Sequence, residues 1–211
     1  MLPQAGCGLC PRLADLRAVN RASLPDGHND VVAPFGDTAA RLLIVGLAPG
    51  RQGANRTGRP FTGDYAGDLL YPRLIAAGFA RGNYDRRPDD GLQLIETRIT
   101  NAVRCVPPEN KPTTQEIATC NGFLTEEIAG LPRLRAILAL GLVAHKAVLR
   151  ALGLKQNHAA FTHGALHRLP QRDLLLADSY HCSRYNTNTG RLTTEMFDQV
   201  LRQLGEVLET D

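Results

Sequence analysis

The sequence predicts a three-layer α/β/α fold with a central four-stranded parallel sheet. Four short apolar runs, each typical of a buried strand, alternate with segments of helical periodicity. Such alternation favours parallel strands with helices on both faces of the sheet. A chain of 211 residues with 43% hydrophobic content is long enough for one such core, so we expect a single domain over residues 1–211. The expected strands are residues 41–45, 98–103, 135–140 and 172–177.

The expected helices are recognised by their end signals as well as by their apolar stripes. Thr113 and Glu116 form a capping box, which predicts a helix that runs to about Ala129. Pro72 suits the first turn of a helix over 68–77 that Gly78 ends. Two polar segments, 81–91 and 181–193, are expected as a surface connection and a loop. The remaining helices are expected at residues 12–20, 142–152 and 194–208.

Composition narrows the class of protein. The net charge of +3 comes from 24 basic and 21 acidic residues, so any affinity for DNA must come from a local patch. The amino-terminal residues lack the basic start and apolar stretch of a signal peptide, and no apolar run approaches the roughly 20 residues of a membrane span. We therefore expect a cytoplasmic monomer that makes no membrane contact.

Four of the five cysteines have the spacing of a metal centre. Cys7 and Cys10 form a CxxC pair, and Cys105 and Cys120 follow at a distance along the chain. In a reducing cytosol disulfides are not expected, and four thiolates suit either a zinc ion or an iron–sulfur cluster. Spacing alone does not decide between these two, and four unrelated buried thiols are the alternative. Cys182 is expected to pack as a small apolar residue.

The segment 46–70 is predicted to be a ligand-binding loop. It follows the first expected strand, and open α/β sheets bind ligands at the carboxyl ends of their strands. Its glycines let the backbone approach a ligand, its arginines suit phosphate groups, and Phe61 offers an aromatic face. An ordinary surface loop rich in turn residues is the alternative reading.

Three stretches together resemble the family 5 uracil-DNA glycosylases, the UDGb group of the uracil-DNA glycosylase superfamily. These are residues 46–70, residues 100–105 (TNAVRC) and residues 181–193 (HCSRYNTNTGRLT), and the four-cysteine pattern is of the family's type. The resemblance implies the uracil-DNA glycosylase-like α/β/α fold and a [4Fe-4S] cluster on the four cysteines. It also implies removal of uracil, and of other deaminated bases such as hypoxanthine, from double-stranded DNA at the start of base excision repair. In a prokaryote such an enzyme is expected at the nucleoid.

Individual roles follow from the residues and from that resemblance. An extruded base can stack on Phe61 and match its Watson–Crick edge to the amide of Asn101. His181 can donate a hydrogen bond to O2 of the departing base. A core aromatic, a strand-end cap and a structural histidine are the respective alternatives.

The residue that activates water is less evident from the sequence. Asp64 matches the aspartate that is implicated in the family, and the alternative is a residue that caps the next helix. Gly46, Ala48 and Gly50 are expected to line the substrate pocket. Ala48 stands where many superfamily members carry a polar or acidic residue.

The DNA-contacting residues are expected in two loops. Ser183, Arg184, Tyr185 and Asn186 resemble a tip that enters the duplex, with Arg191 on a phosphate nearby. Phosphate contacts are also expected of arginines in the first loop, and a merely solvated polar surface is the alternative. These are Arg51, Arg56 and Arg59.

Two other functions compete with a glycosylase. Ala48 and the lack of an unambiguous general base would suit an iron–sulfur DNA-binding module without glycosylase activity. A phosphate-binding transferase is weaker, because the loop lacks the Lys-Ser/Thr ending of a P-loop.

Overall fold

The computed structural model describes residues 3–209, and its centre is a five-stranded sheet. The strand order is β4-β1-β5-β7-β6, and the first four strands run parallel while β6 pairs antiparallel with β7. The bounds are β1 Leu42–Gly46, β4 Thr97–Asn101, β5 Ala136–Leu140, β6 Leu166–Arg168 and β7 Leu175–Ser179.

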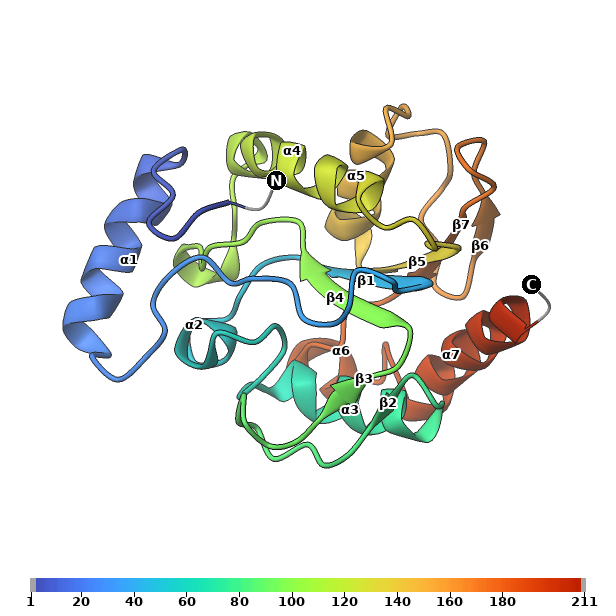
Figure 1. The fold of residues 1–211 in the computed structure, drawn as a ribbon, viewed down its shortest axis with the longest axis horizontal. Coiled ribbons are helices and arrows are strands. Elements are labelled where there is room, and N and C mark those ends of the chain that lie inside the picture. Colours follow the sequence, from blue (N-terminus) through green and yellow to red (C-terminus); the bar gives the residue numbers. More distant parts are fainter. Residues whose placement is uncertain (1–2, 210–211) are drawn as a thin grey trace.

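Helices cover both faces of this sheet (Figure 1). Alternate residues of β1 point to opposite faces: Leu42 and Ile44 pack in one apolar cluster, Leu43 and Val45 in another. The first cluster includes α3 and α7, and the second includes α4 and α5. Because β1, β4, β5 and β7 are buried along their whole length, the sheet is the middle layer of three. The helices are α3 Tyr65–Ala76, α4 Thr114–Ala129, α5 Leu142–Ala151 and α7 Thr194–Glu209.

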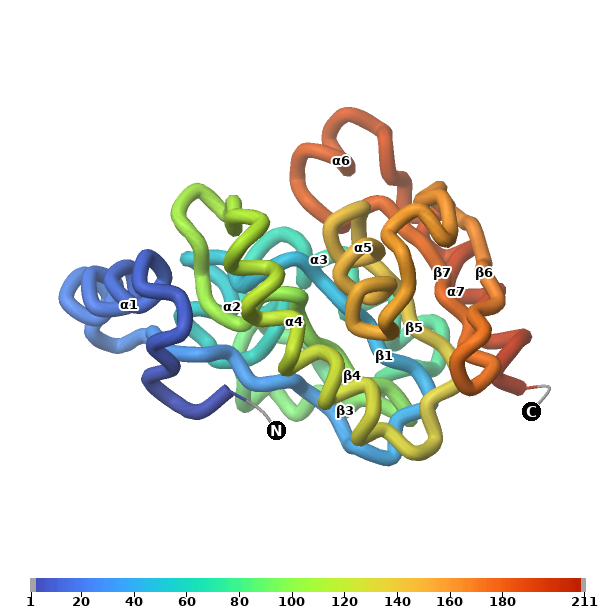
Figure 2. Tube along the Cα trace, turned by 90° about the horizontal axis from the view of Figure 1, so that it is seen from above, coloured from blue at the N-terminus to red at the C-terminus, as the bar shows by residue number. Residues whose placement is uncertain are grey.

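Shorter elements surround the three layers. Helix α1 (Pro11–Ser23) lies at one end of the molecule next to α2 (Ala54–Thr57), and α6 (Arg184–Asn188) projects from the side that Figure 2 shows uppermost. Strands β2 (Ala80–Arg81) and β3 (Gln93–Leu94) form a small antiparallel pair, and a 3-10 turn, η1, spans Pro108–Asn110. Among the described residues, no helix is long and apolar enough to cross a bilayer.

The three-layer fold and its four parallel strands confirm the prediction, with differences at several elements. The capping box on α4 is present: Thr113 Oγ1 accepts from the Glu116 N–H, and the Glu116 carboxylate accepts from the Thr113 N–H. The edge strand β6 was not expected. The fourth parallel strand begins at Leu175 rather than at Arg172, because Arg172 and Asp173 take positive φ angles in a turn.

Two helices differ from the prediction. Helix α3 begins at Tyr65, so Pro72 lies in its interior rather than in its first turn. The segment 181–193, expected as a loop, contains α6, which Ser183 caps through its Oγ.

Candidate active site

A cavity of about 400 Å³ opens at the carboxyl ends of the parallel strands. Residues 47–50 reach it from the end of β1, Asn101 from the end of β4, and His181 from just beyond β7. This is the position at which open α/β sheets place their ligands. Its lining residues are Leu47, Ala48, Pro49, Gly50, Phe61, Asp64, Tyr65, Ala66, Asn101, Asn110, His181 and Ser183.

Gly46 at the end of β1 lets two pocket residues approach the strand. A Cβ atom at this position would lie 2.4 Å from the Phe61 ring and 2.4 Å from Asn101 Oδ1. Both distances are far below van der Waals contact, so the Phe61 ring and the Asn101 amide occupy the space of the missing side chain. Phe61 is 6% exposed and has a φ of 52°, a backbone conformation that few non-glycine residues adopt. Gly46 was expected to line the pocket, but it lies behind Phe61 and Asn101, which line the cavity in its place.

Asn101 presents an amide that the protein leaves unpaired. Its side chain is 3% exposed, yet within residues 3–209 it forms no hydrogen bond, while its main-chain carbonyl accepts from Arg104 Nε at 3.1 Å. A buried amide usually finds a partner, because burial without one costs about 1 to 3 kcal/mol. An unpaired amide that lines a cavity is ready to bind a ligand.

His181 faces the same cavity, next to Phe61. The two ring centroids are 6.0 Å apart with an interplanar angle of 32°. Burial lowers the pKa of His181 to about 4, so the imidazole is neutral at pH 7 and carries one N–H. The ring forms no hydrogen bond within the described chain, whereas the main-chain carbonyl of His181 accepts from Asn186 Nδ2 at 2.9 Å. The imidazole N–H is thus available to a ligand.

The two carboxylate oxygens of Asp64 have different surroundings. It is the N-cap of α3, where Oδ1 accepts from the Gly67 N–H at 3.3 Å. Its Oδ2 lies so close to the loop that a Cβ on Gly50 or Gly53 would approach it to 2.9 or 2.3 Å. Burial raises the pKa of Asp64, although N–H groups at the start of α3 oppose the shift. Asp64 is therefore a capping residue that also lines the cavity.

The expected DNA-contacting tip is a protruding element next to the cavity. Tyr185 in α6 is 70% exposed, and Ser183 lies at the cavity margin. The Arg184 guanidinium lies 5.2 Å from the Tyr65 ring centroid, and the Arg191 guanidinium lies 4.6 Å from that of Tyr180. Tyr65 lines the cavity, so its contact holds Arg184 at the cavity margin, and both arginines remain exposed.

The three arginines of the first loop differ in their environments. Arg56 is exposed, and its guanidinium forms no hydrogen bond or ion pair within the described residues. Arg51 binds α1, donating to Asn20 Oδ1 at 2.9 Å and to Ser23 Oγ at 3.0 Å. For Arg59 the expectation of a phosphate contact is wrong, because its guanidinium is buried in a bidentate ion pair with Asp90.

The four cysteines of the expected metal centre converge although they are far apart in sequence. Cys7, Cys10, Cys105 and Cys120 line one small apolar cavity between α1 and α4. Arg17 ties the group together, since Nη1 donates to Cys105 Sγ at 3.0 Å and Nη2 to the Cys7 carbonyl oxygen at 2.5 Å. Cys182 lies elsewhere, fully buried in the core.

Several residues that line the cavity or form buried polar contacts were not predicted from the sequence. Tyr65 and Asn110 line the cavity, and Asn110 belongs to the 3-10 turn η1, in which it takes a positive φ angle. A buried network of His145, His167 and Asp178 lies on the face of the sheet that α5 covers. Neither spacing nor flanking residues in the sequence point to that network.

Comparison with known proteins agrees with this geometry. Residues 33–205 match the family model of the uracil DNA glycosylase superfamily. A type-5 uracil-DNA glycosylase of Thermus thermophilus is 47% identical over 93% of this chain and 91% of its own length. A type-5 enzyme of Pyrobaculum aerophilum is 41% identical over 93% and 87%, and a type-4 uracil-DNA glycosylase of the same organism is 32% identical over 79% and 78%. The chain therefore belongs to the uracil-DNA glycosylase superfamily, and within it to the type-5 group.

Proposed function

We propose that this protein is a monofunctional DNA glycosylase that hydrolyses the N-glycosidic bond of uracil, and of other deaminated bases such as hypoxanthine, in duplex DNA. The observation that carries the proposal is the cavity in which an aromatic ring, an unpaired amide and an unpaired neutral imidazole face one another. Base excision repair starts with such a reaction.

The cavity supports recognition of an extruded base by its edge and its face. Phe61 stacks on the base, and the Asn101 amide accepts from N3–H of uracil and donates to O4. Cavities of about 300 to 1,000 Å³ hold drug-sized ligands, so a cavity of about 400 Å³ also admits a two-ring base. That room supports activity on hypoxanthine as well as on uracil.

Cleavage leaves negative charge on the base and positive charge on the sugar. His181 donates its N–H to O2 of the departing base, and a neutral imidazole suits this role because it carries one donor and adds no positive charge to the pocket. Asp64 Oδ2 orients the attacking water while Oδ1 stays on the N-terminus of α3. Ala48 adds no polar group, Gly46 lets Phe61 and Asn101 approach β1, and Gly50 lets Asp64 Oδ2 approach the loop.

DNA binding depends on a local surface rather than on the net charge of +3. Ser183, Arg184 and Tyr185 form the tip that supports base extrusion, with the exposed Tyr185 as its most prominent side chain. Arg56 and Arg191 contact phosphates on either side of the cavity.

The four converging thiols support a [4Fe-4S] cluster, since four Cys thiolates hold such clusters and all four residues line one small cavity. When bound, the cluster supplies a structural link between α1 and α4 rather than a reactive group. Purified protein should contain iron and acid-labile sulfide, and stoichiometric zinc in anaerobically purified protein would contradict the assignment.

A strand-scission assay tests the proposed function. The protein is incubated with labelled duplex that contains uracil or hypoxanthine, and alkali then cleaves the abasic sites. We expect cleavage at both lesions and none at thymine or adenine. Binding of the duplex without any alkali-labile product would instead support the iron–sulfur DNA-binding module.

A further inference from the structure

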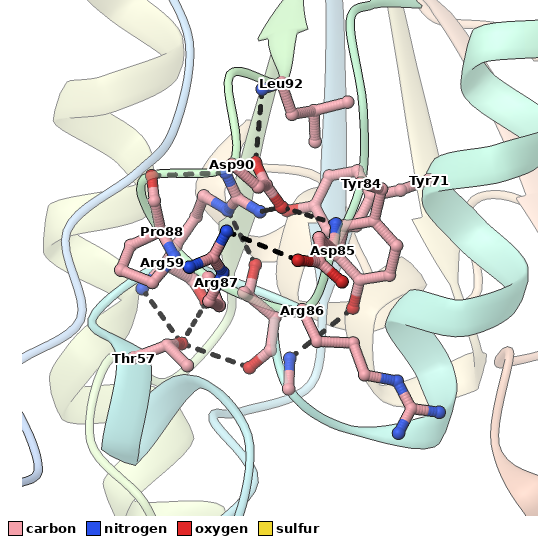
Figure 3. Close-up of polar contacts among 12 residues, drawn as sticks. Thr57, Arg59, Tyr71, Tyr84, Asp85, Arg86, Arg87, Pro88, Asp90 and Leu92 are labelled. Atoms are coloured by element: carbon pink, nitrogen blue, oxygen red, sulfur yellow. Dashed lines mark hydrogen bonds and ion pairs between the residues drawn. The ribbon is translucent and has the colours of Figure 1, made fainter.

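Arg59 and Asp90 form a buried ion pair between the first loop and the turn that precedes β3 (Figure 3). Arg59 Nη1 and Nη2 donate to the two Asp90 oxygens at 2.9 and 2.7 Å, and the two side chains are 6% and 0% exposed. Asp90 also accepts from the N–H groups of Asp85 and Leu92 at 2.9 and 3.1 Å. Burial opposes the charge on Asp90, but these donors outweigh burial and hold the pKa of Asp90 below its usual range.

An aromatic cage surrounds the guanidinium of this pair. The Arg59 guanidinium carbon lies 5.2, 5.4 and 6.0 Å from the ring centroids of Phe35, Tyr71 and Tyr84. A buried bidentate pair that is boxed by aromatic rings is a rigid unit, because each of its groups is held from several sides.

The hydrogen bonds of this unit reach the backbone on both sides of Phe61. Arg59 Nε donates to Thr62 Oγ1 at 2.7 Å, and that hydroxyl donates in turn to the Pro60 carbonyl at 3.2 Å. The Tyr71 hydroxyl donates to the same carbonyl. The Tyr84 hydroxyl donates to the Phe61 carbonyl at 3.4 Å, and burial raises the pKa of Tyr84 to about 12, so it remains a donor. Phe61 itself needs such support, since its φ of 52° is costly for an aromatic residue.

We propose that Arg59, Asp90 and Tyr84 are positioning residues that hold Phe61 in its pocket-facing conformation, so that the ring is ready to stack on an extruded base. This inference rests on the proposed function, because it assigns Phe61 to base stacking. None of the three positioning residues lines the cavity: Tyr84 bonds the Phe61 carbonyl directly, and Arg59, which Asp90 holds in place, bonds the Thr62 side chain. The ion pair thus gives the buried Arg59 a role in place of the phosphate contact that its sequence position had indicated.

A double-mutant cycle tests the proposal. Single-turnover excision of uracil is measured for wild type, Asp90→Asn, Phe61→Leu and the double variant, with thermal melts of each. We expect Asp90→Asn to slow excision by about tenfold when Phe61 is present and by less than about threefold in Phe61→Leu, as for two residues that act as one unit. The loss should appear in the excision rate rather than in the affinity for duplex.

A matched control separates this role from general stability. Arg73 and Asp198 form another bidentate pair at 2.7 and 2.8 Å between α3 and α7, away from the cavity and with side chains 31% and 28% exposed. Asp198→Asn should leave the excision rate of the folded protein unchanged, and its effect should add to that of Phe61→Leu. If Asp90→Asn does not fold, Tyr84→Phe replaces it in the cycle, since it removes only a hydroxyl.

The outcomes are distinct. Equal rate losses with and without Phe61, or wild-type excision by Phe61→Leu, would overturn the positioning role while the function stands. Failure of the wild-type protein to excise uracil would instead overturn the proposed function itself.

Discussion

Two histidines close to β7, His145 and His181, differ in almost every property. His145 has acceptors at both ring nitrogens: Nδ1 lies 2.8 Å from Asp178 Oδ1, and Nε2 lies 3.0 Å from the Ala159 carbonyl oxygen. Two acceptors require two N–H donors, so His145 is an imidazolium that pairs with the carboxylate of Asp178. Burial alone would lower the pKa of His145, but the Asp178 and Ala159 acceptors outweigh burial and raise it.

His181 shows the opposite arrangement. Its pKa is lowered to about 4 by burial, and the ring has no hydrogen-bond partner among residues 3–209. Asn101 in the same cavity also lacks a partner, whereas both oxygens of Asp178 have one, the second from His167 Nε2 at 3.2 Å. The comparison indicates that polar groups left unpaired at a cavity mark the chemical site, and that fully paired buried groups mark the scaffold.

Among substitutions of the cavity residues, Asp64→Asn should have the largest effect on the rate of uracil excision. We expect uracil excision to fall by about 10²- to 10⁴-fold, the usual span for a general base, with the fold and duplex binding kept. Because the pKa of Asp64 is raised, the acid limb of the wild-type rate profile should belong to Asp64 and vanish in the variant. Single-turnover rates across the pH range check both points.

Placing a carboxylate at Ala48 is the control for Asp64. Ala48→Asp should partly restore excision to Asp64→Asn, since both residues line the cavity. Near-wild-type excision by a well-folded Asp64→Asn protein would remove Asp64 from the site and leave it as a helix cap.

His181→Ala should come next in size. Loss of one oxyanion donor costs about 2.7 to 4 kcal/mol of transition-state stabilisation, so the excision rate should fall by about 10²- to 10³-fold while the affinity for duplex stays near wild type. Unfolding in urea should be little changed, because the His181 ring has no hydrogen bond to lose within residues 3–209. Wild-type single-turnover rates would contradict the role.

His145→Ala should show the reverse pattern. Removal of one partner of a buried ion pair costs about 3 to 5 kcal/mol, and we expect the lower end because His167 still binds Asp178. The free energy of unfolding in urea should fall by that amount, with an unchanged excision rate for the folded fraction. A large rate loss without destabilisation would break the distinction between site and scaffold.

The smallest expected effect is a difference in pH dependence between the two histidines. Because the pKa of His145 is raised, its stabilisation is complete below an unfolded pKa of about 6.5 and is lost as pH rises through the folded value. The lowered pKa of His181 has the opposite sign, so folding stability declines as pH falls from about 6.5 towards about 4. The cost of His145→Ala should therefore shrink with rising pH, and His181→Ala should flatten the acidic decline. Urea titrations at several pH values check both signs.

Local chemistry determined which parts of the molecule were predictable from sequence. The buried strands and the capping box of α4 depend on apolar runs and on residues three positions apart, so both were found. The short edge strand β6 has alternating exposure and little apolar character, and it was missed. Phe61, Asn101 and His181 were found because they lie in motifs at strand ends, whereas Tyr65 and Asn110 were missed.

Charged residues were less predictable, because their roles depend on partners far along the chain. Arg56 and Arg59 look equivalent in sequence, but Asp90, 31 positions from Arg59, turns that arginine into part of the interior. The same holds for His145, whose partner Asp178 lies 33 positions away. No local pattern reports such pairs.

The absence of a side chain at Gly46 has a consequence for engineering this enzyme. Phe61 and Asn101 fill the space of the missing side chain, so any larger residue at Gly46 would displace one of them. Substitutions at Gly46 therefore cannot reduce the cavity in small steps while Phe61 and Asn101 keep their positions. A variant that excludes large bases must therefore carry its substitution at another residue that lines the cavity. Ala48 lines the cavity with only a methyl group, so larger side chains at this position can narrow the cavity stepwise.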